Sequence, residues 1–285
     1  MHLSQRKYIR LKGRLLDLSQ PRVVGIVNVT PDSFYAPSRA SSASEVISRV
    51  EQMLEQGVDI VDVGAVSTRP GALMPDAEEE WRRLKPALEA LVKEWPELPV
   101  SVDTWRPEIA RRALDAGAAM INDISGGTFE EGMARTAAEY QVPVVLMHTS
   151  APPHLMQNHT DYEDVVRDVM AFLISQATAW EQEGVRDIII DPGIGFGKTI
   201  FQNFELLAYL HLYKTLPWPV MVGLSRKRFI RVTLGVNAEE ALNGTTALHM
   251  VCLQAGVRLL RVHDVKEAVQ CIKLFMSLQE ASAIP

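Results

Sequence analysis

Short apolar stretches rich in β-branched residues recur along the chain, and each is followed by a polar turn and an amphipathic segment. Several of them, such as Val-Val-Gly-Ile-Val and Ile-Ile-Ile, are nearly continuous apolar runs, which is typical of parallel strands buried on both faces. The pattern predicts eight strands, at residues 23–30, 59–64, 99–104, 119–125, 143–149, 187–191, 219–225 and 259–264.

Amphipathic segments separate these strands and carry apolar residues at helical spacing. A glycine follows four of the segments, namely Gly57, Gly117, Gly184 and Gly256. Glycine at that position commonly adopts the left-handed conformation that ends a helix. The pattern predicts helices at residues 44–56, 77–94, 107–116, 131–140, 162–183, 201–216, 238–255 and 266–279.

The alternation of strands and helices predicts a single (β/α)8 barrel, also called a TIM barrel, because eight units follow one another without a linker or a low-complexity tract. A doubly wound sheet would use fewer units and carry a glycine-rich nucleotide-binding turn after its first strand, which this chain lacks. Residues 7–18 are typical of a hairpin that turns at Gly13. We therefore expect one domain over residues 1–285, with an N-terminal hairpin extension at 1–20 that covers the lower end of the barrel.

Composition agrees with this expectation, since 285 residues with 47% hydrophobic and 22% charged positions are ordinary for a globular protein and suit a barrel of about 250 residues. The net charge of −6 argues against sequence-independent binding of nucleic acid, which requires a dense basic surface. No stretch reaches the ~18 apolar residues of a membrane-spanning helix. We expect a cytoplasmic protein without membrane contact, in which Cys252 and Cys271 are buried, reduced thiols.

Polar residues collect where the strands are expected to end. The carboxyl ends of barrel strands form one rim, and active sites of such barrels lie at this rim. A random scatter of charges would not mark every strand end while leaving the strand bodies apolar. The rim residues are Asn28, Asp32, Asp62, Arg69, Asp103, Asn122, Asp123, His148, Asp191, Lys198, Ser225, Lys227, Arg261 and His263.

The rim residues divide by charge. Arginines, a histidine and an amide oxygen suit a phosphate or diphosphate with Mg²⁺. Such residues follow the first, second and last strands, which are neighbours in a closed barrel: Asn28, Arg69, Arg261 and His263. Inward-facing carboxylates, an amide and a lysine suit a flat nitrogen heterocycle with ring N–H, amino and carbonyl groups. These residues follow the third, fourth, sixth and seventh strands: Asp103, Asn122, Asp191 and Lys227.

Two other interpretations of the rim are disfavoured. The stretch Gly193-Ile-Gly-Phe-Gly-Lys-Thr199 resembles a phosphate-binding P-loop, but the glycine that this motif requires is replaced by Pro192. A transition-metal site built on His148 and His263 would resemble a metallohydrolase, but the first strand carries no His-x-His.

Seven rim motifs, in order along residues 23–270, resemble the dihydropteroate synthase family of pterin-binding enzymes. They are Asn28-Val-Thr-Pro-Asp-Ser-Phe34, Ser67-Thr-Arg-Pro-Gly71, Ser101-Val-Asp-Thr104, Asn122-Asp-Ile124, Asp191-Pro-Gly-Ile-Gly-Phe-Gly-Lys198, Ser225-Arg-Lys227 and Arg261-Val-His-Asp264. The resemblance implies a (β/α)8 fold and a step of folate synthesis. In that step the amine of p-aminobenzoate displaces pyrophosphate from 6-hydroxymethyl-7,8-dihydropterin diphosphate, through a pterin cation.

The resemblance also implies roles for individual residues. The pterin would be held by Asp103, Asn122, Asp191 and Lys227, and the diphosphate by Asn28, Thr68, Arg69, Arg261 and His263, with Mg²⁺ on Asn28. Phe196, Pro70 and Ser225 would line the p-aminobenzoate slot, where sulfonamides would compete, and Ile124, Met147, Gly195 and Gly223 would complete the substrate pocket. The residues expected to act in catalysis are Asp103, Asp191, Lys227 and Arg261. A homodimer is expected, with the strongly apolar helix at 201–216 as its surface.

Two alternatives stay open at this point. A methyltetrahydrofolate–corrinoid methyltransferase would share the acidic pterin pocket but has no need for the anion site of Arg69, Arg261 and His263. Loss of a rim residue would support a non-catalytic pterin-binding paralogue that acts only through a partner, and none is missing from the core motifs. The chain departs from the common family pattern at residues 35–39, which replace an Asp-Gly-Gly loop, and at residues 65–66, which replace Gly-Glu.

Overall fold

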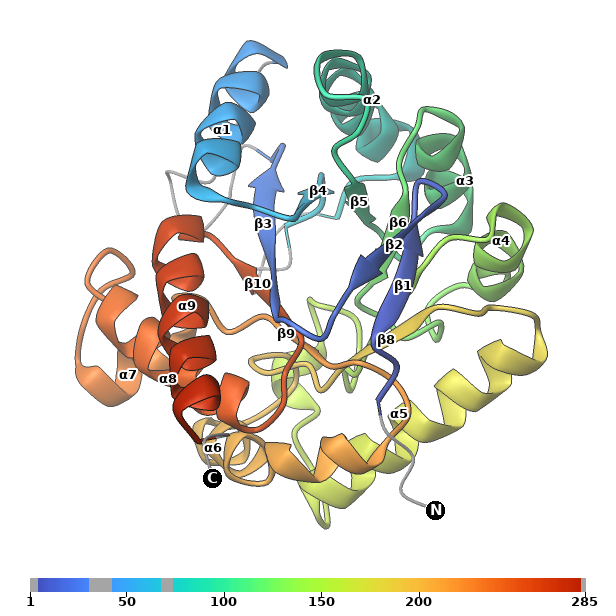
Figure 1. Ribbon diagram of the computed structural model, residues 1–285. Coiled ribbons are helices and arrows are strands. Elements are labelled where there is room, and N and C mark those ends of the chain that lie inside the picture. The colour runs from blue at the N-terminus through green and yellow to red at the C-terminus, as the bar shows by residue number, and fades with distance from the viewer. Residues whose placement is uncertain (1–4, 31–42, 68–73, 283–285) are drawn as a thin grey trace.

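The computed structural model describes residues 5–30, 43–67 and 74–282, and it confirms the predicted barrel. Eight parallel strands form one sheet in the order β8-β7-β6-β5-β4-β3-β10-β9 (Figure 1). A bridge between Ile190 and Val220 joins the two outermost strands and closes the barrel. The strands are β3 (Arg22–Asn28), β4 (Ile60–Gly64), β5 (Val100–Asp103), β6 (Met120–Asp123), β7 (Val144–Met147), β8 (Ile188–Asp191), β9 (Met221–Val222) and β10 (Leu259–Val262).

Helices follow the strands and form the outer layer of the barrel (Figure 1). They are α1 (Ala43–Gln56), α2 (Ala77–Glu94), α3 (Pro107–Asp115), α4 (Met133–Tyr140), α5 (Val165–Gln182), α6 (Ile200–Ala208), α7 (Arg228–Leu234), α8 (Leu242–Gln254) and α9 (Val265–Ser282), with short 3₁₀ helices η2 (Met156–Asn158) and η3 (Leu210–Thr215). The strand expected at 219–225 is shortened to Met221–Val222, and the helix expected at 238–255 begins at Leu242. Two further differences concern the helices. The helix expected at 201–216 is divided into α6 and η3 at Tyr209, and α7 is an additional short helix.

The N-terminal hairpin closes the lower end of the barrel. Strands β1 (Tyr8–Leu11) and β2 (Arg14–Asp17) pair antiparallel through a turn at Lys12 and Gly13, whose φ angles of +49° and +74° are those of a tight hairpin turn. Three apolar side chains within and after the hairpin, Ile9, Leu11 and Leu18, are buried against the inward-facing residues at the starts of the strands. That apolar floor comprises Val24, Ile60, Met120, Val145, Ile189, Met221 and Leu259.

The register of the strands places polar side chains on the inward face one layer above this floor. Successive residues of a strand point to opposite faces, so Ile60, Asp62 and Gly64 share the inward face of β4. Asp62 is paired in register with Ile26 on one side and Ser101 on the other, and Asp103 is paired with Asn122. The interior of the barrel therefore changes from apolar to polar toward the carboxyl ends of the strands. No helix in the described part of the chain is long and apolar enough to cross a membrane.

Candidate active site

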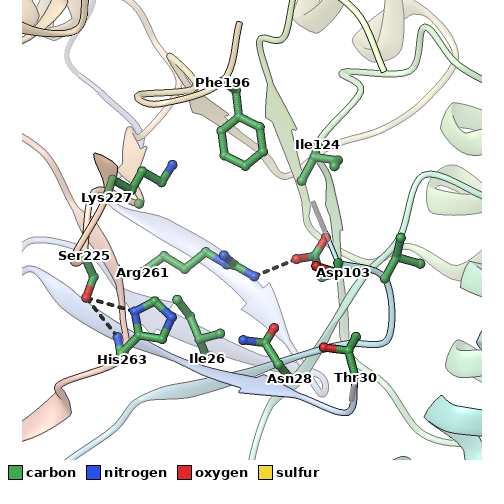
Figure 2. Close-up of a pocket in the computed structure, with 13 residues that line it drawn as sticks. Ile26, Asn28, Thr30, Asp103, Ile124, Phe196, Ser225, Lys227, Arg261 and His263 are labelled. Atoms are coloured by element: carbon green, nitrogen blue, oxygen red, sulfur yellow. Dashed lines mark hydrogen bonds and ion pairs between the residues drawn. The ribbon is translucent and has the colours of Figure 1, made fainter. Parts of the chain in front are cut away.

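A cavity opens at the carboxyl ends of the strands, where the sequence predicts the site (Figure 2). Most of its lining consists of predicted site residues: Asn28, Asp103, Ile124, Phe196, Gly223, Ser225, Lys227, Arg261 and His263. The lining also includes Ile26, Thr30, Val66 and Ser67, which are not among the predicted substrate contacts. Ile26 and Asn28 are two residues apart on β3, so their side chains lie on the same inward face. This alternation could therefore have identified Ile26 as a residue of the cavity lining.

Arg261 joins Asp103, which lines the cavity, to the buried carboxylate of Asp62. Its Nη2 donates to Oδ2 of Asp103 at 2.6 Å (Figure 2). Its Nε donates to Oδ2 of Asp62 at 2.7 Å. Asn122 donates from Nδ2 to the same oxygen of Asp62 at 3.0 Å. The single positive charge of the Arg261 guanidinium therefore faces two negatively charged carboxylates. The same group joins the acidic rim residues to the basic ones. Asp62, predicted at the rim but given no substrate role, is the acceptor that connects this network.

Burial and charge set the protonation of the network. Burial raises the pKa of Asp103 to about 7; the guanidinium of Arg261 opposes this shift and the carboxylate of Asp62 adds to it. Burial also raises the pKa of Asp191, although Lys227 and a hydrogen bond from the Gly193 amide, 2.7 Å from Oδ1, oppose the rise. For Arg261, burial lowers the pKa, but the two carboxylates outweigh burial and the net shift is upward. Arg261 therefore remains charged while Asp103 titrates near neutrality.

Lys227 reaches across the cavity toward the loop after β8. Its Nζ donates to the carbonyl of Ile194 and lies 4.2 Å from the centre of the Phe196 ring. Burial lowers the pKa of Lys227 to about 7, and the carboxylate of Asp191 opposes that shift. Gly195 permits this approach because its φ is +87° and an added Cβ would lie 2.5 Å from Cδ of Lys227.

His263 and Ser225 line the wall of the cavity that lies across from Asp103 and Ile124 (Figure 2). Nδ1 of His263 lies 3.0 Å from Oγ of Ser225. Burial lowers the pKa of His263 to about 3, and the nearby Arg261, Arg226 and Arg49 lower it further. The imidazole is therefore neutral at pH 7 and can act on an anion as a hydrogen-bond donor, not as a charge.

Two arginines outside the cavity lining hold this wall in place. Arg226 has a φ of +54° and forms a two-pronged ion pair with Asp264, with both N···O distances at 2.8 Å. Arg49, from α1, donates from Nη2 to the carbonyl of His263 at 3.0 Å. Arg49 is absent from the predicted site because it comes from a helix and not from a strand end.

Four other predicted residues lie next to the cavity without lining it, and three lie outside the described residues. Asn122 and Asp191 sit behind the lining in the hydrogen bonds given above, and Gly195 packs against Lys227. Met147 packs in an apolar cluster with Trp105 and Ile124. The residues outside the described part of the chain are Thr68, Arg69 and Pro70.

Oxygen atoms that suit a hard cation are present at the end of β3. The Thr30 hydroxyl is buried and makes no hydrogen bond within the described residues. Asn28, two residues earlier, lines the same cavity (Figure 2). Amide, hydroxyl, phosphate and water oxygens are the ligands that Mg²⁺ takes at sites where it binds together with a substrate phosphate. This donor set therefore fits Mg²⁺.

Comparisons with known proteins agree with this geometry. A model of the family described as "Pterin binding enzyme" matches residues 24–263. The chain is 40% identical to the dihydropteroate synthase of Escherichia coli (strain K12) over 265 residues, which are 92% of this chain and 93% of that protein. It is 42% identical to the dihydropteroate synthase of Synechocystis sp. over 255 residues, which are 88% of each protein.

Solved structures show the same relationship. The dihydropteroate synthase of Xanthomonas albilineans with 4-aminobenzoic acid is 41% identical and superimposes with a TM-score of 0.88, covering 98% of this chain and 99% of that one. The enzyme of Thermus thermophilus in complex with 6HMPPP is 38% identical, with a TM-score of 0.84 over 96% of this chain and 100% of that one. The resemblance seen in the rim motifs is confirmed, and the chain belongs to the dihydropteroate synthase family of pterin-binding enzymes.

Proposed function

We propose that this protein condenses 6-hydroxymethyl-7,8-dihydropterin diphosphate with p-aminobenzoate, giving 7,8-dihydropteroate and pyrophosphate. The observation that supports this function is the pairing of Arg261 with Asp103 in the lining of the cavity and with the buried Asp62 next to that lining. That pairing places carboxylates for a nitrogen heterocycle and a cation for its diphosphate within one hydrogen-bonded group. The corrinoid methyltransferase alternative has no need of the cation.

The deep, acidic side of the cavity is proposed to bind the pterin. Asp103, Asn122 and Asp191 would accept from or donate to the ring nitrogens and amino group, and Lys227 would donate to the ring carbonyl. Ile124 and Gly223 would supply the surface around the ring, and Met147 would support it from the apolar cluster that it forms with Ile124. Asp191 is buried and the Asp103 side chain is 17% exposed, so both act on the ring in surroundings where charges are less screened than in bulk water.

The same carboxylates favour the chemical step. The C–O bond to the diphosphate breaks and its electron pair leaves with the pyrophosphate, so positive charge develops on the exocyclic carbon and spreads into the pterin ring. Ionised Asp103 and Asp191 stabilise that charge. The amine nitrogen then forms the new C–N bond and loses one proton to solvent, so no residue has to act as a base.

The basic wall would hold the diphosphate as its charge increases. Arg261 supplies a fixed positive charge, and neutral His263, positioned by Ser225 and by the Arg49 contact to its carbonyl, supplies a hydrogen-bond donor. Thr68 and Arg69 are proposed to complete this side. Mg²⁺ held by Asn28, with Thr30 beside it, would supply charge neutralisation of the leaving group when bound.

The slot for p-aminobenzoate is proposed to lie between Phe196, Pro70 and Ser225 at the mouth of the cavity. Phe196 presents its ring into the cavity (Figure 2). The related enzyme from Yersinia pestis has been solved with a sulfonamide drug complex, with 34% identity and a TM-score of 0.90 over 96% of this chain. A sulfonamide is therefore proposed to compete with p-aminobenzoate here.

Release of pyrophosphate tests the proposed function. Purified protein with Mg²⁺ should release pyrophosphate only when the pterin diphosphate and p-aminobenzoate are both present. Absence of release with both substrates would refute the proposal. Tight binding of both substrates without release would instead support the non-catalytic paralogue.

The pH dependence of kcat/KM for the pterin diphosphate should show a narrow maximum near pH 7. Below it Asp103 becomes protonated, and above it Lys227 loses its charge, since each has a pKa of about 7. In Lys227→Arg, kcat/KM should still fall at low pH but should no longer fall at high pH, because arginine stays protonated. Lys273→Arg, on the exposed side of α9, is the matched control. Persistence of the high-pH loss in Lys227→Arg would contradict this assignment.

A homodimer is proposed from exposed apolar side chains on the segment expected to form the dimer surface. Phe201 of α6 is 76% exposed, Tyr209 is 50% exposed and Leu212 of η3 is 36% exposed. Val232 and Leu234 of α7 and Val251 of α8 are also exposed. The mass in solution, measured by light scattering, should be about twice 31.7 kDa for the wild type and should fall toward one chain in Phe201→Glu.

A cytoplasmic location is proposed as well. Cys252 and Cys271 are both free and buried, which suits a compartment where thiols stay reduced.

A further inference from the structure

The loop between β8 and α6 folds around a buried lysine. Lys198 is 5% exposed, and its ammonium donates to the carbonyl of Phe196 at 2.9 Å and to that of Gly193 at 3.1 Å. Its Nζ also lies 3.0 Å from Nδ1 of His148. Lys198 is not among the residues that line the cavity. The lysine of this P-loop-like stretch therefore points inward and binds carbonyl groups of its own loop.

The glycines of the loop show how closely it is packed. Gly193 and Gly197 have φ angles of +68° and +56°. A Cβ at Gly193 would lie 1.9 Å from the carbonyl oxygen of His148, and a Cβ at Gly197 would lie 2.0 Å from Oγ of Ser150. The loop thus rests directly on the chain that follows β7, and only glycine fits at these two positions.

The loop presents two groups to the cavity. The ring of Phe196 points into it (Figure 2). The carbonyl of Ile194 accepts a hydrogen bond from Lys227, a lining residue. Lys198 binds the backbone of Phe196 directly and that of Gly193, next to Ile194. The positions of the ring and of the Lys227 acceptor therefore both depend on carbonyl groups that surround the Lys198 ammonium.

Burial of an ammonium group costs desolvation free energy, so a loop that needed only stability would not require a buried lysine. Within the described residues, no carboxylate lies within ion-pair distance of Lys198. Its Nζ instead has uncharged acceptors around it: the carbonyl oxygens of Phe196 and Gly193, that of His148 at 3.5 Å, and Nδ1 of His148. An apolar side chain of similar length would leave those acceptors unpaired in the interior, and the loop would have to rearrange to satisfy them.

We propose that Lys198 is a positioning residue for the aromatic amine substrate, acting through the backbone of Phe196 and not through contact with any substrate. The inference rests on the proposed function and deepens it. Asp103 and Asn122 are hydrogen-bonded to Arg261 and Asp62, away from this loop, whereas Asp191 and Lys227 contact the loop at the amide of Gly193 and the carbonyl of Ile194. Loss of Lys198 should therefore affect the p-aminobenzoate site more than the pterin site.

Lys198→Met tests the proposal by a split between the two Michaelis constants. KM for p-aminobenzoate should rise about tenfold or more, as expected when a substrate contact is displaced by a fraction of an ångström. KM for the pterin diphosphate should rise several-fold less, because Asp103 and Asn122 make their hydrogen bonds away from the loop and only Asp191 and Lys227 contact it. Lys214→Met is the matched control, because Lys214 also donates to a carbonyl, that of Gln254 at 2.8 Å, but lies exposed on the outside of the barrel.

A double variant shows whether Lys198 acts through Phe196. Phe196→Ala alone should raise KM for p-aminobenzoate, and adding Lys198→Met should raise it little further, because the ring that the lysine positions is gone. Independent, multiplicative effects of the two changes would overturn the proposal. Equal rises in both Michaelis constants in Lys198→Met would overturn it as well, since general damage to the fold produces that result.

The outcomes separate this inference from the proposed function. If the wild type releases no pyrophosphate, the proposed function fails. If the wild type is active and Lys198→Met shows no split, only the positioning role fails. If Lys198→Met does not fold, Lys198→Gln, which keeps two of the N–H donors, must show a smaller split in the same direction, and its absence overturns the proposal.

Discussion

Replacing Arg261 with methionine is expected to lower kcat/KM for the pterin diphosphate by about 10²- to 10³-fold, the usual loss when a preorganised group that stabilises developing charge is removed. The variant should also lose about 3–5 kcal/mol of stability, because Asp62 and Asp103 would then be buried without their shared cation. Steady-state kinetics and urea unfolding measure the two effects.

Two variants control for this change. Arg261→Lys keeps the charge but loses the fork that reaches both carboxylates, so its kinetic loss should be smaller than that of the methionine variant. Arg258→Met removes an arginine just before β10, at the closed end of the barrel, where the side chain donates to the carbonyl of Ser19. Unchanged kcat and KM in Arg261→Met would contradict the division of the cavity into a basic side for the diphosphate and an acidic side for the pterin.

Asp103→Asn is expected to raise KM for the pterin diphosphate by about 10- to 100-fold, because a hydrogen bond to a charged group contributes about 1.5–3 kcal/mol and 1.4 kcal/mol corresponds to a tenfold change. Inhibition by pyrophosphate alone should be retained or strengthened. The reason is that Arg261 keeps its bond to Asp62 and is no longer shared with a second carboxylate. Competition assays with pyrophosphate measure this directly.

The matched control for that change is Asp115→Asn, which alters an exposed carboxylate at the end of α3 bound to the hydroxyl of Tyr140. It should leave both substrates unaffected. A parallel loss of pyrophosphate binding in Asp103→Asn would mean that Asp103 orients Arg261 for the diphosphate, and the assignment of Asp103 to the pterin would then fail.

The eight strands could be predicted because burial on both faces makes several of them nearly continuous apolar runs, and because each is followed by a polar turn and an amphipathic segment. Helix α7 could not be predicted: Arg228–Leu234 has seven residues, two of them β-branched near its end, and no side-chain cap, so no helical period develops. The division of residues 201–216 into α6 and η3 could not be predicted either, because apolar residues occur along the whole segment and mark no boundary. Pro217 requires extended backbone at Leu216, where φ is −87° and ψ is 149°, and the turn before it tightens to a 3₁₀ helix.

The site could be predicted as a set of residues but not as a set of contacts. Strand alternation and the barrel rim indicate that Asp103 and Arg261 face one cavity. Which carboxylates share the guanidinium depends on strand tilt and side-chain rotamers, so the central position of Asp62 appears only in three dimensions. Arg49 illustrates the same limit, because its contact with the carbonyl of His263 joins a helix to a strand end far away in the sequence.

The hairpin gives the molecule one open end and one sealed end. Substrates and products must all use the rim, while the sealed face offers positions that can be altered freely. Leu15 of β2 is 68% exposed on that face, and both native cysteines are buried. A Leu15→Cys variant could therefore be coupled to a sensor surface through a single reactive thiol. Every molecule would then be oriented with the open end of its barrel toward the solution.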